Sequence, residues 1–274
     1  MRLTLLVLMI AATACHGGQH RSGVTAVDTA LVAPDGSPVP GGEMGRSIRR
    51  GRAILAATGD SLPDHVGNGL RCVSCHLSDG RRPDAIPFTG VYARYPAYRS
   101  RSASIQQIED RINGCFQRSM AGTPLAFDDP GMRDIVNYFA FLSRGIPVGD
   151  TTPGLEPETG LSGDSAAGAQ VFTLRCARCH GADGAGRDTF PAVWGPRSFT
   201  IGAGMARIRT LTGFIHHNMP RDSAGVLTDA EALNVAAYIS SQPRPDYAGK
   251  EHDWPLGDAP PDVPYPTLAN PRKR

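Results

Sequence analysis

Two short segments with the same pattern carry the clearest chemistry in this sequence. Cys72-Val-Ser-Cys75-His76 and Cys176-Ala-Arg-Cys179-His180 both follow the pattern Cys-x-x-Cys-His. Two cysteines at this spacing form thioether bonds to the vinyl groups of a haem, and the histidine that follows reaches the iron. Two Cys-x-x-Cys pairs could instead hold one zinc ion, but a zinc site does not explain a histidine directly after each pair. The sequence therefore predicts two covalently bound haem c groups, with His76 and His180 as iron ligands.

A second axial ligand is expected for each haem. In small cytochromes it is usually a methionine in the loop before the last helix, and Asn218-Met219-Pro220 supplies one 39 residues after His180. The same spacing from His76 leads to Cys115. The number of cysteines supports Cys115 as the ligand at this position. Of six cysteines, four belong to the haem motifs and Cys15 to the amino-terminal region, so Cys115 has no disulfide partner.

Cys115 is thus predicted to ligate the first iron. Two alternatives remain: Cys115 is a buried core cysteine while Met120 ligates the iron, or the position is open. Residues 104–118 are expected to form a helix, because Ile105, Ile108, Ile112 and Cys115 follow helical spacing.

Arginines are concentrated around Cys115. Residues 81–118 contain seven arginines and three acidic residues. Arginine binds oxyanions through a planar fork of donors. Arg111 lies one helical turn before Cys115 and Ser119 one turn after it, so the three are expected on one helix face. A single arginine could equally be a solvated surface charge or a partner of a haem propionate.

At these residues the chain resembles the dihaem thiosulfate dehydrogenases, whose first domain is related to the sulfur-oxidising cytochromes with cysteine-ligated haem. The resemblance runs from about residue 45 to 245. It is carried by residues 66–77, 95–101, 109–120, 202–207 and 218–220. The segment around Cys115 is the specific one, whereas Cys-x-x-Cys-His and Asn-Met-Pro fit many cytochromes.

The resemblance implies an enzyme that joins two thiosulfate ions into tetrathionate and releases two electrons. It places Cys115, Arg101, Arg111 and Ser119 at the active site. Some members have a lysine before the methionine of the second haem and exchange the two ligands on reduction. Asn218 stands at that position here, and an amide is a poor iron ligand, so fixed His180/Met219 ligation is expected.

The ligand types also suggest a direction of electron flow. A thiolate lowers the potential of the first haem and a thioether raises that of the second. Electrons are therefore expected to leave through the second haem to an external acceptor, which we expect to be a cytochrome c.

These residues require a scaffold, and the sequence predicts an all-α fold of two class I cytochrome c-like domains. Domain 1 is expected at 43–146 and domain 2 at 165–245, joined by a linker at 147–164. Each domain should close with an amphipathic helix. Asp129-Pro130 is the start signal of the first, and Thr228 with Glu231 is that of the second. The proline-rich residues 246–274 are expected to lie extended over the surface.

The amino terminus indicates the compartment. Arg2 precedes an apolar run, Leu3 to Ile10, which is followed by small residues and Cys15, so residues 1–15 are expected to be an export signal. Residues 16–42 are expected to be a flexible tether. The segment Ala12-Thr-Ala-Cys15 resembles a lipobox, so Cys15 is either a lipid anchor or part of a cleaved or disordered piece. A periplasmic or other extracytoplasmic location follows. The formal net charge of +2 gives no argument for nucleic acid binding.

Other functions remain possible on the sequence alone. A dihaem cytochrome that only transfers electrons would gain little from a thiolate ligand and an arginine cluster. A sulfur-carrier cytochrome would need a partner chain, and the second haem domain argues mildly against it. A tetrathionate reductase would run the same reaction in reverse.

Overall fold

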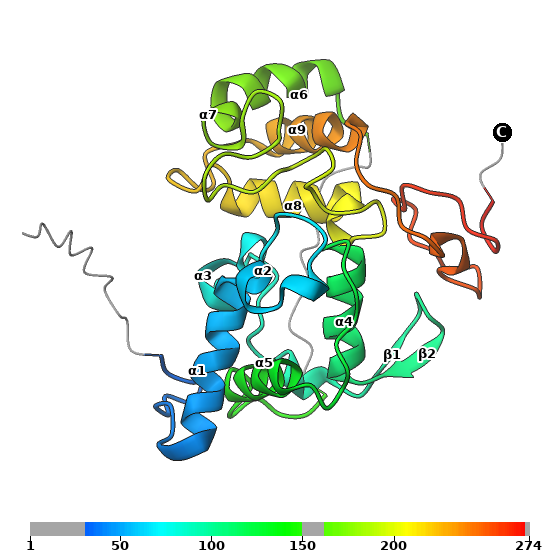
Figure 1. Ribbon diagram of the computed structural model, residues 1–274. Helices are drawn as coiled ribbons and strands as arrows, with labels where there is room; N and C mark the ends of the chain where they lie inside the picture. Colours follow the sequence, from blue (N-terminus) through cyan, green and yellow to red (C-terminus); the bar gives the residue numbers. More distant parts are fainter. Residues whose placement is uncertain (1–30, 150–161, 272–274) are drawn as a thin grey trace, which may run out of the picture. The chain divides into compact units, whose positions relative to one another are not determined.

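The computed structural model describes residues 31–149 and 162–271. Helices dominate these residues, as expected for an all-α fold, and one short hairpin accompanies them (Figure 1). The predicted export signal, Cys15, most of the predicted tether, the middle of the predicted linker and the last three residues lie outside the described part. Both helical groups belong to one unit, Val32–Arg274.

The first group contains the first haem motif. Its regular elements are α1 (Gly42–Ala56), α2 (Thr58–Ser61), α4 (Ile108–Arg118) and α5 (Pro130–Phe141). Single turns lie between α2 and α4: η1 (Pro63–His65), η2 (Cys72–Ser74), α3 (Leu77–Gly80) and η3 (Tyr92–Arg94). Helix α5 begins where its sequence signal predicts, because the Asp129 side chain accepts hydrogen bonds from the amides of Gly131 and Met132.

A β-hairpin replaces the first turn of the helix predicted at 104–118. Strands β1 (Ala97–Arg99) and β2 (Ser104–Gln106) pair antiparallel, and Ile105 lies opposite Tyr98. Ile105 is 66% exposed and does not face the core. The helical prediction was wrong over these residues, because Ile105 fits helical spacing in the sequence but belongs to a strand in the structure. Helix α4 itself begins at Ile108, after Gln107 caps it together with Asp110.

The second group repeats this plan around the second haem motif. Helix α6 (Ser165–Val171) continues through a π-helical turn, η4 (Phe172–Cys176), into α7 (Ala177–His180). The turn η5 (Gly204–Ala206) precedes α8 (Ile208–Asn218), and α9 (Asp229–Ser241) closes the group. Thr228 and Glu231 form the predicted capping box at the start of α9.

The first and last helices of each group cross at a glycine. Helix α1 packs on α5, and α6 packs on α9. A side chain at Gly51 would overlap the carbonyl of Asp134, and one at Gly168 would overlap that of Asn234. Tyr138 and Tyr238 follow one turn later at the two crossings. The backbones can approach this closely only because glycine has no Cβ. The first and last helices therefore pack in the same way in both halves.

Among its described residues, the carboxy-terminal segment contains no helix or strand apart from the short turn η6 (Lys250–His252). It is also packed: Asp253, Trp254, Tyr265 and Thr267 are all buried. Figure 1 shows this segment, in orange and red, on the same side as the hairpin.

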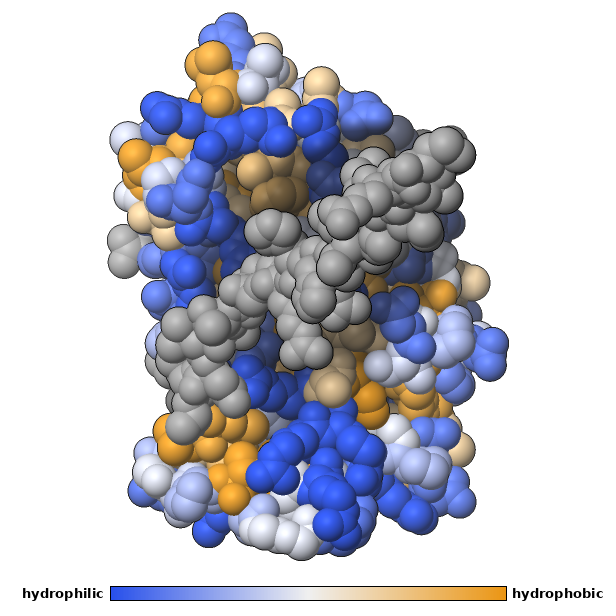
Figure 2. Space-filling view, turned by 60° about the vertical axis from the view of Figure 1, so that its left-hand side comes forward, coloured by the Kyte–Doolittle hydropathy of each residue, from blue (hydrophilic) through white to orange (hydrophobic). Residues whose placement is uncertain are grey.

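On the face drawn in Figure 2, hydrophilic residues predominate and apolar residues occur in small groups between them. No helix within the described ranges is long and apolar enough to cross a membrane.

Candidate functional site

The first haem motif begins on η2, and Thr58 contacts its first residue, Cys72. The Thr58 hydroxyl accepts a hydrogen bond of 3.1 Å from the Cys72 amide. His76 stacks on Phe88, with 4.1 Å between ring centroids, and its Nδ1 contacts the Ile86 carbonyl. A carbonyl can only accept, so Nδ1 carries the proton and Nε2 keeps its lone pair. Burial lowers the pKa of His76 to about 4. A neutral imidazole with a free Nε2 is what an iron ligand requires.

Cys115 lies beside this motif, on helix α4. Burial, with a smaller contribution from the charge of the nearby Cys115, raises the pKa of both Cys72 and Cys75 to about 12. The Arg111 Nη1 donates a hydrogen bond of 3.0 Å to the Cys115 Sγ. This contact, with the charge of Cys115, raises the pKa of Arg111. Arg111 also contributes to lowering the pKa of His76. The Arg111 guanidinium, the Cys115 sulfur and the His76 imidazole therefore lie close together.

The other predicted active-site residues are placed as follows. Ser119 is the C-cap residue of α4, directly after Arg118, so it follows Cys115 by one turn. Arg101 lies at the tip of the hairpin, and its Nη1 donates to the Gly202 carbonyl at 2.9 Å. Arg111 and Cys115 are thus in direct contact, whereas Arg101 is held by the second half of the chain. Met120, the alternative ligand, is 3% exposed.

The end of α4 is fixed by residues that sequence reasoning missed. Asn68 donates to the carbonyls of both Ser119 and Ser198, each at 2.9 Å. Thr200 donates to the Arg118 carbonyl at 2.6 Å. The bond from Asn68 to Ser198 spans 130 positions in the sequence, and the bond from Thr200 to Arg118 spans 82. No local pattern marks such bridges. They hold the turn that follows Cys115 against the second half of the chain.

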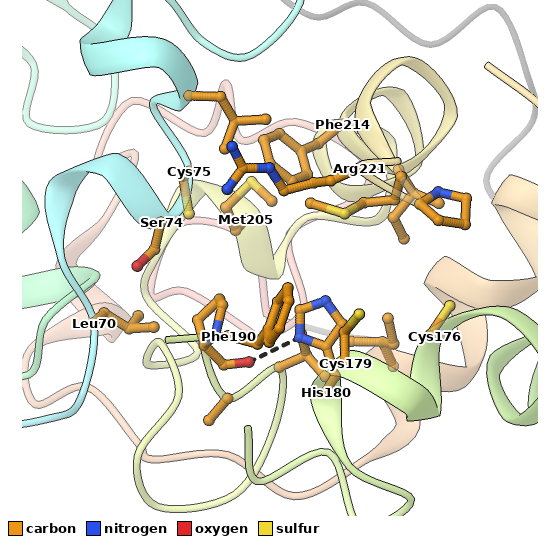
Figure 3. A pocket seen from close by; sticks show the side chains of 18 of the residues that line it. Leu70, Ser74, Cys75, Cys176, Cys179, His180, Phe190, Met205, Phe214 and Arg221 are labelled. Carbon is orange, nitrogen blue, oxygen red and sulfur yellow. Dashed lines mark hydrogen bonds between the residues drawn. The ribbon is translucent and has the colours of Figure 1, made fainter. Parts of the chain in front are cut away.

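The second haem motif opens into a cavity of about 700 Å³. Cys176, Cys179, His180 and Met219 line it, together with apolar side chains such as Phe172, Phe199 and Phe214. His180 Nδ1 contacts the Pro191 carbonyl at 2.8 Å (Figure 3), which again leaves Nε2 free. Burial lowers the pKa of His180. Two thiols, a neutral imidazole and a thioether around an apolar cavity of this size fit a covalently bound haem.

Two methionines line this cavity, and only one was predicted. Met219 directly follows α8, and Met205, labelled in Figure 3, lies on η5. The loop of Met219 is anchored through its neighbour Asn218, which is fully buried. The Asn218 Nδ2 donates to the Asp84 carbonyl at 2.6 Å and to the Phe214 carbonyl at 3.1 Å. The methionine loop of the second haem site is therefore bonded to the first half of the chain.

The two haem sites are close neighbours. Leu70, Ser74 and Cys75 of the first half line the second cavity together with Cys179 and His180. The partly buried Cys75 also packs against the apolar core of the second half. The first attachment motif is thus part of the wall of the second site.

Family models match both halves of the chain. The model described as "SoxA/TsdA, cytochrome c domain" matches residues 64–148. The model described as "Cytochrome C oxidase, cbb3-type, subunit III" matches residues 163–239. The boundary between the two matches falls in the predicted linker.

Similar whole proteins are thiosulfate dehydrogenases. The one from Psychrobacter arcticus is 40% identical over 242 residues, which covers 85% of this chain and 74% of the relative. The one from Allochromatium vinosum is 42% identical over 233 residues, covering 79% and 85%. The solved structure of thiosulfate dehydrogenase (TsdBA) from Marichromatium purpuratum matches with a TM-score of 0.75 at 33% identity. That match covers 85% of this chain and 54% of the solved chain, so this protein spans about half of its length.

Proposed function

Because this chain belongs to the thiosulfate dehydrogenase family, we propose that it oxidises two thiosulfate ions to tetrathionate at the Cys115 site. A sulfur–sulfur bond forms between the two terminal sulfurs, and each thiosulfate gives up one electron. The protein has two cytochrome c domains and carries two covalent haem c groups. When bound, each haem supplies one-electron redox chemistry.

We assign the haem-binding residues from their placement. Cys72 and Cys75 would form the thioether bonds of the first haem, and His76 and Cys115 would ligate its iron. Cys176 and Cys179 would do the same for the second, with His180 and Met219. The first assignment is supported by the proximity of Cys115 to both attachment cysteines, and the second by the shared cavity.

The hydrogen bond between Arg111 and Cys115 is the observation that carries the proposal. The guanidinium fixes a positive charge beside the Cys115 sulfur, and the thiolate is the reactive and metal-binding form of a cysteine. Arg111 also places a cation where a dianion must approach a second negatively charged group. The mutual repulsion of two thiosulfate ions opposes coupling, so fixed positive charge at this point lowers the barrier.

Ser119 and Arg101 would complete the substrate site. Ser119 ends the helix that carries Cys115, and its hydroxyl can donate to a sulfonate oxygen. Arg101 offers a planar fork of donors for the same group. The electrons would pass from the second domain to an external acceptor, which we propose is a cytochrome c. An extracytoplasmic location and a lipid anchor at Cys15 belong to this proposal as well.

The test is a ferricyanide-coupled assay of the haem-loaded protein with thiosulfate, with tetrathionate measured as the product. We expect two ferricyanide ions reduced for each tetrathionate formed. A protein whose haems are reduced by dithionite but not by thiosulfate, across a range of pH, would instead be an electron carrier without a substrate of its own.

A further inference from the structure

The carboxy-terminal segment contacts two arginines of the first half, Arg101 and Arg118. The Trp254 ring lies 4.6 Å from the Arg101 Cζ, in a cation–π arrangement. The Trp254 amide also donates to the Arg101 carbonyl at 2.8 Å. Trp254 is 3% exposed. The segment therefore contacts both the side chain and the backbone of Arg101.

The second arginine, Arg118, anchors the segment. Its two terminal nitrogens donate to the Asp253 carboxylate at 2.8 and 2.7 Å. Tyr265 donates to the same carboxylate at 2.6 Å, and the Tyr247 ring lies 4.3 Å from the Arg118 Cζ. Asp253 is 4% exposed. Arg118 belongs to the last turn of α4, so this buried pair ties the segment to the helix that carries Cys115.

Arg101 differs from Arg118 because its charge is not neutralised by a carboxylate. Its hydrogen-bond acceptor is the uncharged Gly202 carbonyl, and within the described ranges no carboxylate lies in ion-pair distance of it. Burial, with a smaller contribution from the positive charge of Arg118, lowers the pKa of Arg101 to about 10, and the more weakly acting charge of Asp253 opposes this shift. It stays charged at neutral pH. An aromatic face fixes the plane of a guanidinium while leaving its N–H edge free for an anion.

We propose that the carboxy-terminal segment, residues 246–271, is part of the substrate site and that Trp254 is a positioning residue for Arg101. Trp254 and the Gly202 carbonyl hold the guanidinium plane, and the remaining N–H groups bind the sulfonate end of thiosulfate. The Asp253–Arg118 pair fixes the segment relative to Cys115. This inference rests on the proposed function and deepens it, because it assigns a role to a segment beyond both haem domains.

Steady-state kinetics of the holoprotein with thiosulfate and ferricyanide test this. Trp254→Leu removes the aromatic face without changing any charge, and we expect KM for thiosulfate to rise roughly ten-fold. The value of kcat should stay within about two-fold, as expected when binding to ground and transition states is weakened equally. Trp254→Phe keeps an aromatic face and should restore most of the loss. Leu256→Ala changes an exposed residue of the same segment and serves as the matched control.

Two results would overturn the inference. One is an unchanged KM in Trp254→Leu. The other is an equal fall of kcat in Trp254→Leu and Trp254→Phe together with lower melting temperatures, which would make the residue purely structural. Failure of the proposed function is a separate result, because the wild-type protein would then form no tetrathionate in the same assay.

Discussion

Arg111 donates a 3.0 Å hydrogen bond to the Cys115 sulfur from one helical turn earlier in α4. The two residues are four positions apart, so the helix itself sets their distance. No rearrangement of a loop is needed to bring the cation to the sulfur. The Arg111–Cys115 pair is therefore built into a single element, whereas Arg101 lies on the hairpin and contacts the carboxy-terminal segment.

Replacing Arg111 should weaken catalysis more than replacing an exposed arginine nearby. Hydrogen bonds to charged groups contribute about 1.5–3 kcal/mol, so Arg111→Gln should lower kcat/KM for thiosulfate by roughly ten- to a hundred-fold. Arg111→Lys keeps the charge but loses the planar fork, and an intermediate loss is expected. Arg99→Gln, on the exposed strand β1, is the control. Equal activities of Arg111→Gln and Arg99→Gln would contradict a role for the contact with Cys115.

The two methionines of the second cavity can be told apart by substitution. Met219→Leu conserves volume and removes the thioether. It should abolish the weak red absorption band of methionine-ligated ferric haem and allow cyanide to bind the second haem readily. Met205→Leu alters the same cavity and should leave the band in place. If the band disappears in Met205→Leu and persists in Met219→Leu, the ligand has been assigned to the wrong methionine.

The helix crossing at Gly51 predicts a large effect on stability from one methyl group. A Cβ at this position would overlap the Asp134 carbonyl, so Gly51→Ala forces α1 and α5 apart. Overpacking of this kind costs about 1–3 kcal/mol, which should lower the free energy of unfolding measured in denaturant. Gly69→Ala is the matched control, because a Cβ there meets nothing within 4 Å. A Gly51→Ala protein as stable as Gly69→Ala would show that the helices cross differently.

Local signals in the sequence predicted much of the scaffold. Asp129 and Thr228 cap the helices that they were expected to start, because capping depends on neighbours two or three residues away. The Cys-x-x-Cys-His motifs identified the cofactor for a similar reason, since the attachment chemistry fixes the spacing. Ile105 was assigned to a helix because its position fits helical spacing. Spacing in the sequence gives no information about the pairing with Tyr98 that makes Ile105 a strand residue.

The rest of the site depends on contacts between distant residues. Asp253 and Arg118 are 135 positions apart, and the bridge from Asn68 to Ser198 spans 130. No spacing rule connects such residues. The sequence predicted a tail that lies extended over the surface, whereas the burial of Trp254 and Asp253 against the arginines required the three-dimensional arrangement.

The most direct test of the central proposal compares wild-type protein with Cys115→Met. Methionine can still ligate iron but cannot supply a thiolate. The measurement is tetrathionate formed from thiosulfate, with reduction of the second haem by dithionite as the control for intact electron transfer. We predict no tetrathionate from Cys115→Met while the second haem stays reducible. Full activity of Cys115→Met would contradict a catalytic role for Cys115.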